Sequence, residues 1–414
     1  MSNYWIPRSL GELEQAIVGC SIEESAYLDV KRYPVRDDKG RQGIAKDLAA
    51  FSVHGGVIIF GIAEHKDPRS RPVDGQIFEL MPGELKGWRE WVSQIAAMAV
   101  QPAVRVSTFE LEREAGVGYL VVVVPQSARA PHMVEGRYYG RTDTTNRQLS
   151  DIEARELWLR NLDRRTDALA LLRAEVAREP APESIRTTAR LFVVAQPVSA
   201  DDRLLLDVVP NGDLRSWAGG LEETVTFQKD GGYAPSFGSA SMVSRRARGV
   251  ARSRRVDPDR VVRTEDASSV DSSDLVDLEI HEDGSLHLYY GRASDLLRST
   301  GRSYILATAI CGEVSRIVQF ARDISEHASF KGAWTLGVAI VGLKGLGAHR
   351  DRFNVYADML WPYSEDTYEQ TYEADHIELM ESGSPVLEQL LGRFCRALLP
   401  MDRPTNSLDL FPVA

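Results

Sequence analysis

The sequence predicts an α+β (α/β) protein of two domains, the first a mixed sheet with flanking helices and the second a further α/β domain. The chain has 414 residues, which is long for one hydrophobic core and comfortable for two. Over residues 1–163, helical apolar repeats alternate with short β-type runs in the order αβαβαββ(β)α. The character of the sequence then changes. We expect residues 164–228 and 276–414 to form the second domain, with 229–275 as a flexible insertion rich in Arg and Ser.

Local signals define the elements of the first domain. Ser9 can cap the first helix, and Glu12 completes a capping box. His54-Gly55-Gly56 ends a later helix, because glycine can adopt the left-handed conformation of a helix stop. The expected elements are, in order, a helix over 9–20, a strand over 27–31, a turn-like stretch over 34–43, a helix over 44–53, an apolar central strand over 57–62, a helix over 88–99, strands over 103–111, 118–125 and 137–141, and a helix over 150–161.

The second domain has fewer strong signals. Glu282-Asp283-Gly284-Ser285 predicts a hairpin turn between two apolar runs. The aromatic and acidic stretch from Trp361 to Tyr368 can line a surface for a ligand or protein partner, or can pack its own side chains together. The other expected elements are a helix over 168–178, strands within 191–209, strands over 275–280 and 286–290, a helix over 305–327, a strand over 334–343 and a helix over 386–399.

Composition bounds the compartment and the partners. No apolar stretch reaches the roughly 18 residues that span a bilayer, and the first residues lack a signal peptide's features. Three cysteines far apart in the sequence favour reduced thiols and a cytoplasmic location. The net charge is −11, but residues 1–162 hold 20 Lys and Arg against 22 Asp and Glu. Global charge therefore neither supports nor excludes a nucleic-acid partner, for which a local basic groove is enough.

Eight arginines lie between Arg245 and Arg263. As a flexible arm they could hold a nucleic-acid backbone through counterion release. The alternative is a disordered, solvated loop whose arginines pair with the acidic stretch 265–277, which we favour because both signs of charge lie side by side.

Three segments of the first domain carry a family resemblance. They are Glu24-Ser25-Ala26-Tyr27-Leu28-Asp29-Val30-Lys31, the segment from Ala49 to Glu64 with Gly55-Gly56 at its centre, and the segment from Pro131 to Arg141 ending in Tyr138-Tyr139-Gly140-Arg141. In this order and spacing, residues 20–160 resemble the Schlafen AlbA_2 family. The resemblance implies a compact domain that handles nucleic acid.

The acidic residues of these segments suggest a metal site. An extended strand places Asp29 and Lys31 on one face, and Glu64 comes just past a buried strand. Carboxylates that converge there suit Mg²⁺ or Mn²⁺, which could polarise a phosphodiester while Lys31 or Arg141 offsets the transition-state charge. Similarity to Schlafen-like ribonucleases implies a catalytic and metal-binding triad of Glu24, Asp29 and Glu64. The alternative is a solvated strand face with a routine ion pair.

The sequence departs from the family pattern at two of these positions. Asp29 stands where the family has the longer Glu, which draws the carboxylate oxygens back toward the backbone. Ala63 takes the first acidic position after the central strand, which leaves Glu64, or the more distant Asp67, as the third carboxylate.

Basic residues of the same segments are the predicted nucleic-acid contacts: Lys31, Arg32, Lys46, His54, Arg137 and Arg141. For His54, a role at the helix end beside the dipole is the favoured alternative to a phosphate contact. No Walker sequence appears in the chain, so nucleotide binding through a P-loop has no support.

Three functions follow from these observations. The first is a metal-dependent endoribonuclease that acts on tRNA or other structured RNA, regulated by the second domain, as a homodimer or higher oligomer that rebuilds the two-lobed cleft of Schlafen nucleases. A bacterial stress or phage-defence role fits by analogy. The second is a non-enzymatic DNA-binding regulator whose C-terminal domain senses a ligand or partner. The third is a scaffold subunit without nucleic-acid contact.

Overall fold

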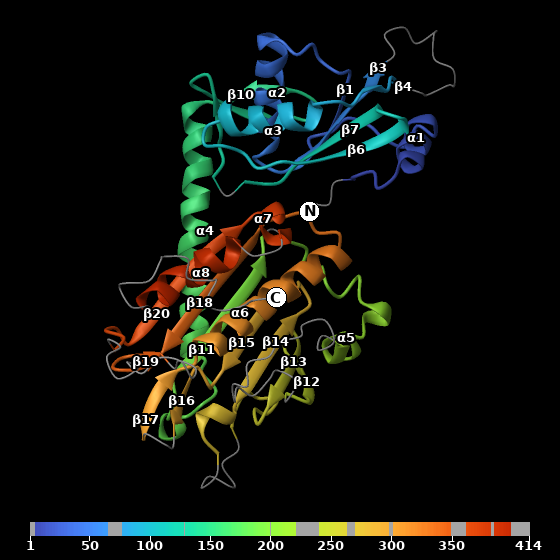
Figure 1. Cartoon of the computed structure of the whole chain (residues 1–414). Helices are drawn as coiled ribbons and strands as arrows, with labels where there is room; N and C mark the ends of the chain where they lie inside the picture. The colour runs from blue at the N-terminus through green and yellow to red at the C-terminus, as the bar shows by residue number, and fades with distance from the viewer. Residues whose placement is uncertain are drawn as a thin grey trace. The chain divides into compact units, whose positions relative to one another are not determined.

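The computed structural model describes residues 5–64, 77–127, 129–198, 200–220, 240–262, 270–297, 301–348, 362–381 and 385–398. The chain divides into two compact units. The first comprises Met1–Asp163 with the short pieces Lys331–Ala333 and Asp375–Ile377, and the second comprises the remainder. Both units combine helices with sheets, which confirms the predicted α+β class (Figure 1).

The first unit is built on a mixed sheet. Strands β1 and β2 are parallel, and the order continues antiparallel through β7 to β5, with β6 also paired to β7. Its elements are α1 (Leu10–Val18), β1 (Leu28–Lys31), α2 (Asp38–Phe51), β2 (Gly56–Phe60), β3 (Ile62–Glu64), β4 (Phe78–Leu80), β5 (Gly83–Glu84), α3 (Trp88–Met98), β6 (Ser107–Glu114), β7 (Val117–Val124), β8 (Met133–Val134), β9 (Arg137–Arg141), β10 (Asn146–Gln148) and the start of α4 (Asp151–Ala177).

Alternation along the central strands separates two cores. Ile58 and Phe60 of β2 pack with α2 and α3 on one face, whereas Val57 and Ile59 pack with α1 on the other. Every residue of β2 is buried, as expected for a central strand. The predicted helix stop is also present: Gly55 has φ 82°, and a Cβ on Gly56 would lie 2.2 Å from a ring carbon of Phe51.

Two boundaries in this unit differ from the prediction. Helix α2 begins at Asp38, within the stretch expected to be a turn, because the Asp37 side chain accepts a hydrogen bond from the Gly40 amide at 2.7 Å and caps the helix. Helix α4 runs without interruption from Asp151 to Ala177, where two separate helices were expected.

The second unit is built on a seven-stranded antiparallel sheet in the order β12-β13-β14-β15-β11-β18-β20. Helices α6 and α8 cover one face, and the C-terminal part of α4 packs on the other. The bounds of its elements are β11 (Arg190–Pro197), α5 (Leu214–Gly220), β12 (Met242–Arg246), β13 (Gly249–Arg254), β14 (Val276–His281), β15 (Leu286–Tyr290), β16 (Ser294–Leu297), β17 (Arg302–Ile305), α6 (Ala307–His327), β18 (Trp334–Val341), β19 (Gly347–Ala348), β20 (Thr367–Ala374), α7 (His376–Met380) and α8 (Pro385–Ala397).

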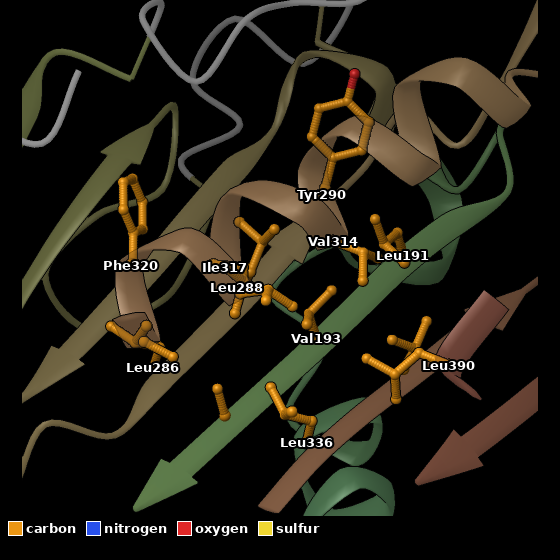
Figure 2. Close-up of a cluster of buried hydrophobic side chains, with 14 of the residues drawn as sticks. Leu191, Val193, Leu286, Leu288, Tyr290, Val314, Ile317, Phe320, Leu336 and Leu390 are labelled. Atoms are coloured by element: carbon orange, nitrogen blue, oxygen red, sulfur yellow. The ribbon is translucent and has the colours of Figure 1, made fainter. Parts of the chain in front are cut away.

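Large apolar side chains fill the space between this sheet and α6 with α8. Figure 2 shows Leu191 and Val193 of β11 and Leu288 of β15 beside Val314 and Ile317 of α6, all fully or almost fully buried. The predicted hairpin is present, since β14 and β15 pair antiparallel across the turn at Gly284. Tyr368 lies in this core, and its hydroxyl donates to the carbonyl oxygen of Leu390. Trp361 lies outside the described residues.

The prediction of a flexible insertion over 229–275 is wrong for its described middle part. Residues 242–246 and 249–254 form strands β12 and β13, which extend the sheet next to β14. Their arginines are ordered by acidic partners: Arg246 lies 2.9 Å from a carboxylate oxygen of Asp277, and Arg254 lies 3.4 Å from one of Asp274. The expected pairing with the acidic stretch is therefore present, within a sheet. Residues 229–239 and 263–269 lie outside the described residues.

Among the residues that the structure describes, no helix is long and apolar enough to cross a membrane.

Candidate functional site

Strand β1 presents two charged side chains on one face. Asp29 and Lys31 alternate with the buried Val30, and the ammonium nitrogen of Lys31 lies 3.0 Å from Asp29 Oδ2. The shared face expected from strand geometry is therefore present. Glu24 precedes the strand, and its Oε1 accepts a hydrogen bond from the Val30 amide at 3.4 Å. One end of β1 thus brings Glu24, Asp29 and Lys31 into one group.

Helix α2 adds a carboxylate that the sequence prediction missed. Asp47 is only 5% exposed, and its Oδ2 lies 2.7 Å from the Lys31 ammonium. Its other oxygen accepts a hydrogen bond from the Asn146 amide of β10. A signal was present in the sequence, because Asp47 falls between Ile44 and Leu48 on the apolar face of the helix. A charge in such a stripe needs a buried partner.

Arg141 closes the group from strand β9. Its guanidinium donates to the carbonyl oxygens of Ser25 and Leu28 at 3.1 and 3.4 Å, and to Asp29 Oδ2 at 3.2 Å. It also donates to Asn146 at 3.2 Å and lies 4.4 Å from the ring centre of Phe51. With only 3% of its side chain exposed, Arg141 ties β9 to β1 and α2.

The electrostatics of this charged cluster, defined as Glu24, Asp29, Lys31, Asp47, Arg141 and Asn146, differ between its members. The pKa of Glu24 is raised to about 6. Burial and then the charge and hydrogen bond of Asp29 raise it, and together they outweigh the Val30 amide and Arg141, which lower it. Burial alone would lower the pKa of Lys31, but the carboxylates of Asp47 and Asp29 outweigh it and raise that pKa. Lys31 is therefore charged at neutral pH, whereas Glu24 can exchange a proton there.

The cluster does not fit a divalent cation as arranged. The Lys31 ammonium already lies between the carboxylates of Asp29 and Asp47, where a metal ion would otherwise bind, and Arg141 takes the same Asp29 oxygen. Within the described ranges, no group of three or more His, Cys, Asp or Glu side chains could hold a metal ion. The Mg²⁺ or Mn²⁺ site that the sequence suggests remains a prediction.

Glu64, the third member of the predicted triad, lies at the exposed end of β3 opposite Phe78 of β4. Lys31 pairs in register with Phe60, and the chain then bends at Gly61 into β3, which pairs with β4. The place of Glu64 in a triad with Glu24 and Asp29 remains a prediction.

The predicted basic contacts fall into two classes. Arg141 is buried within the cluster, and Lys31 is mostly engaged by carboxylates. The side chains of Arg32, His54 and Arg137 are exposed, and Lys46 is half-buried. The Lys46 ammonium lies 5.7 Å from the ring centre of Tyr139, next to Arg137 on β9. Lys46 and Arg137 therefore belong to one surface that also carries aromatic side chains.

A second aromatic pair lies on the opposite face of β9, toward helix α4. The ring of Tyr138 meets the ring of Trp158 edge-on, with centres 5.3 Å apart, and Trp158 is 46% exposed. We name Lys46, Arg137, Tyr138, Tyr139 and Trp158, which border the two faces of β9, the basic-aromatic surface. Cations that neutralise phosphates and flat rings on which bases stack are the components of many single-strand binding sites.

Comparison with known proteins agrees with the motifs of the sequence. Residues 24–150 match the family model described as Schlafen, AlbA_2, which confirms the resemblance for this part of the chain. No curated protein matches the chain.

Two solved structures are similar to part of the chain. One is the DIP2311 protein from Corynebacterium diphtheriae, with 16% identity and a TM-score of 0.24. The match covers 36% of this chain and 28% of that protein. The other is the N-terminal domain of a RecG-related protein from Nitrosomonas europaea, with 19% identity and a TM-score of 0.26 over 35% of this chain and 94% of that domain.

Proposed function

We propose that residues 1–163 bind nucleic acid through the basic-aromatic surface. The observation that carries the proposal is that β9 has Lys46 beside the ring of Tyr139 on one face and the Tyr138–Trp158 ring pair on the other, within and just beyond the segment that matches the AlbA_2 family model. The charged cluster fixes the position of this surface, because Arg141 holds β9 against β1 and α2.

The chemistry of the surface favours exposed bases over a closed duplex. Half-exposed rings can stack on bases, a contribution of about 1–3 kcal/mol per base that tolerates different sequences. Lys46 and Arg137 supply charge for the phosphates, and each phosphate contact makes affinity fall with salt. The near balance of charge in residues 1–162 is compatible with this, since the positive groups are gathered locally.

The test is binding of the full chain to labelled tRNA, single-stranded DNA and duplex DNA, measured by fluorescence anisotropy over a series of salt concentrations. The variant Lys46→Gln/Arg137→Gln should weaken binding and reduce the slope of log affinity against log salt by about 1.5. The matched control is Arg105→Gln/Arg113→Gln, which removes two exposed arginines, one just before β6 and one within it. Strand β6 is separated from β1 by β2 and β7. Equal effects of both double variants would contradict the proposed surface.

A second candidate function is cleavage of bound RNA at the charged cluster. The observation that favours it is the position of Glu24 beside the Asp29–Lys31 pair, where the pKa of Glu24 is raised to about 6 and this carboxyl can take or give a proton near neutrality. Lys31 contacts Asp29, which lies beside Glu24, and the Lys31 side chain is 34% exposed. Its ammonium can therefore stabilise negative charge on a phosphate.

The cleavage candidate has its own test. Purified chain is incubated with labelled tRNA in EDTA, Mg²⁺ or Mn²⁺, and the products are followed over time beside a Glu24→Gln variant. Cleavage that persists in EDTA and is lost in Glu24→Gln supports proton transfer by Glu24. Cleavage that requires a metal ion favours instead the metal-binding triad of Glu24, Asp29 and Glu64 that the sequence predicts.

The remaining parts of the function rest on the sequence resemblance. We keep as proposals that residues 164–414 regulate the first unit, that the protein forms a homodimer or higher oligomer, and that it acts in bacterial stress or phage defence. A DNA-binding regulator is the alternative if duplex DNA binds more tightly than RNA. A scaffold role is the alternative if no nucleic acid binds.

A further inference from the structure

A pocket of about 340 Å³ lies in the first unit, between the end of α2, the β9–β10 hairpin and the first turns of α4. Its volume is at the small end of the range of roughly 300–1,000 Å³ typical of small-ligand sites. The predicted nucleic-acid contact His54 is among the residues that line it.

The polar part of the lining is rich in charged side chains. Three arginines, Arg141, Arg147 and Arg160, face two acidic residues, Glu153 and Glu156. Glu153 is largely satisfied, because Arg147 binds it through two nitrogens at 2.9 and 2.5 Å and the Ser150 amide donates to it at 2.8 Å. These contacts lower the pKa of Glu153 to about 2.

The fixed carboxylate in turn orients the guanidinium of Arg147 at the pocket wall. A guanidinium held in this way loses little conformational entropy when it binds an anion. Arg141 is also held in place, by Asp29 and by two backbone carbonyls. These contacts hold both guanidinium groups in place, and Arg160 adds a third cationic group to the lining, which also contains the acidic Glu156.

The other side of the lining is aliphatic. Val53, Leu149 and Leu157 offer apolar contacts, and Val53 and Leu149 are buried. Leu149 packs so closely on β9 that a Cβ on Gly140 would lie 2.6 Å from its Cδ2. One wall suited to an anion and one suited to a flat apolar ring match the two ends of a nucleotide.

We propose that this pocket binds one nucleotide of a single-stranded nucleic acid, with the phosphate toward Arg147 and Arg160 and the base against Leu149 and Leu157. The inference rests on the proposed nucleic-acid binding of the first unit, and gives it a specific subsite. Trp158 of the basic-aromatic surface lies in the same helical turn as Leu157, so a strand that stacks on that surface can place a neighbouring nucleotide in the pocket.

The test uses adenosine monophosphate, adenosine and inorganic phosphate as probes of the full chain, with binding measured by ligand-observed NMR and calorimetry. We expect the monophosphate to bind at least tenfold more tightly than either fragment, since only it satisfies both walls. Arg160→Gln should weaken it about tenfold, the loss of one charge-assisted contact. Arg155→Gln is the matched control, because Arg155 lies on the same helix, is 70% exposed and does not line the pocket.

Leu157→Trp fills the pocket without changing charge, and both variants are also assayed with a labelled single-stranded oligonucleotide. Loss of monophosphate binding in Leu157→Trp and Arg160→Gln supports the subsite. Salt-dependent oligonucleotide binding that neither variant changes, with no binding of the monophosphate, overturns the subsite and leaves the proposed function intact. Monophosphate binding that depends on Arg160 without any oligonucleotide binding overturns the proposed function and keeps a nucleotide pocket.

Discussion

The ammonium of Lys31 lies 2.7 Å from the carboxylate of Asp47, a buried side chain of helix α2. This pair joins the strand that carries the family's acidic motif to the helix beside it. Asp29 shares the same ammonium at 3.0 Å and also pairs with the guanidinium of Arg141. Two cations therefore balance the two buried carboxylates.

Removal of the lysine should destabilise the first unit. Lys31→Met leaves Asp47 buried without its cation, and we expect a loss of about 2 kcal/mol in the free energy of unfolding, less than for a fully buried pair because Lys31 is 34% exposed. Lys31→Met/Asp47→Leu should recover most of it, because no unpaired charge remains. Urea unfolding measures both, with the exposed Lys39→Met as control. A double variant no more stable than Lys31→Met would contradict this account.

Arg141 should not tolerate replacement by lysine. Arg141→Lys keeps the charge but cannot reach Ser25, Leu28 and Asp29 together, so we expect a loss of about 2 kcal/mol in thermal or urea unfolding. The control is Arg137→Lys on the same strand, which is exposed and should change stability by less than about 0.5 kcal/mol. Similar losses in both variants would show that the contacts of Arg141 are not the cause.

Glu24 should titrate near pH 6 in the folded protein. Its folded pKa lies above the ordinary value of 4.5, so its contribution to stability is fully present below about pH 4.5 and is lost as the pH rises through about 6. Glu24→Gln should therefore match the wild type below pH 4.5 and be more stable than it at pH 7.5. Asp29→Asn should move the NMR titration midpoint of Glu24 to lower pH. A midpoint near 4.5 in the wild type would refute the raised pKa.

The second unit makes a separate prediction about its buried ion network. Burial would raise the pKa of Glu175, but His287 and Arg260 outweigh it and lower that pKa to about 2. Its contribution is present above about pH 4.5 and is lost as the pH falls through about 2. At pH 7, Glu175→Gln should cost about 3 kcal/mol, a difference that shrinks below pH 4.5. The exposed Glu183→Gln is the control, and a pH-independent difference would argue against the ion pair.

Most of the regular elements could be predicted from the sequence because their signals are local. The apolar run of β2 and the capping box of α1 each need only a few neighbouring residues. The start of α2 was missed since Asp37-Asp38-Lys39-Gly40 has the composition of a turn, and only the capping hydrogen bond distinguishes the two. The strands β12 and β13 were missed because their arginines are ordered by Asp277 and Asp274, which tertiary structure brings close.

The candidate site was predicted in part for the same reason. Asp29 and Lys31 lie two residues apart, so strand geometry alone places them together. Asp47 and Asn146 come from distant segments, and Asn146 has no local signal. Glu64 was assigned to the triad by resemblance, and its place there remains a prediction.

The central claim is tested most directly by locating bound nucleic acid on the full chain. A single-stranded oligonucleotide with photoreactive uridines is irradiated with the protein, and the crosslinked peptides are identified by mass spectrometry. We expect crosslinks at Tyr138, Tyr139 or Trp158, and the crosslink yield should decline as the salt concentration is raised. Crosslinks confined to residues 164–414, or at the same yield in Lys46→Gln/Arg137→Gln as in the wild type, would contradict it.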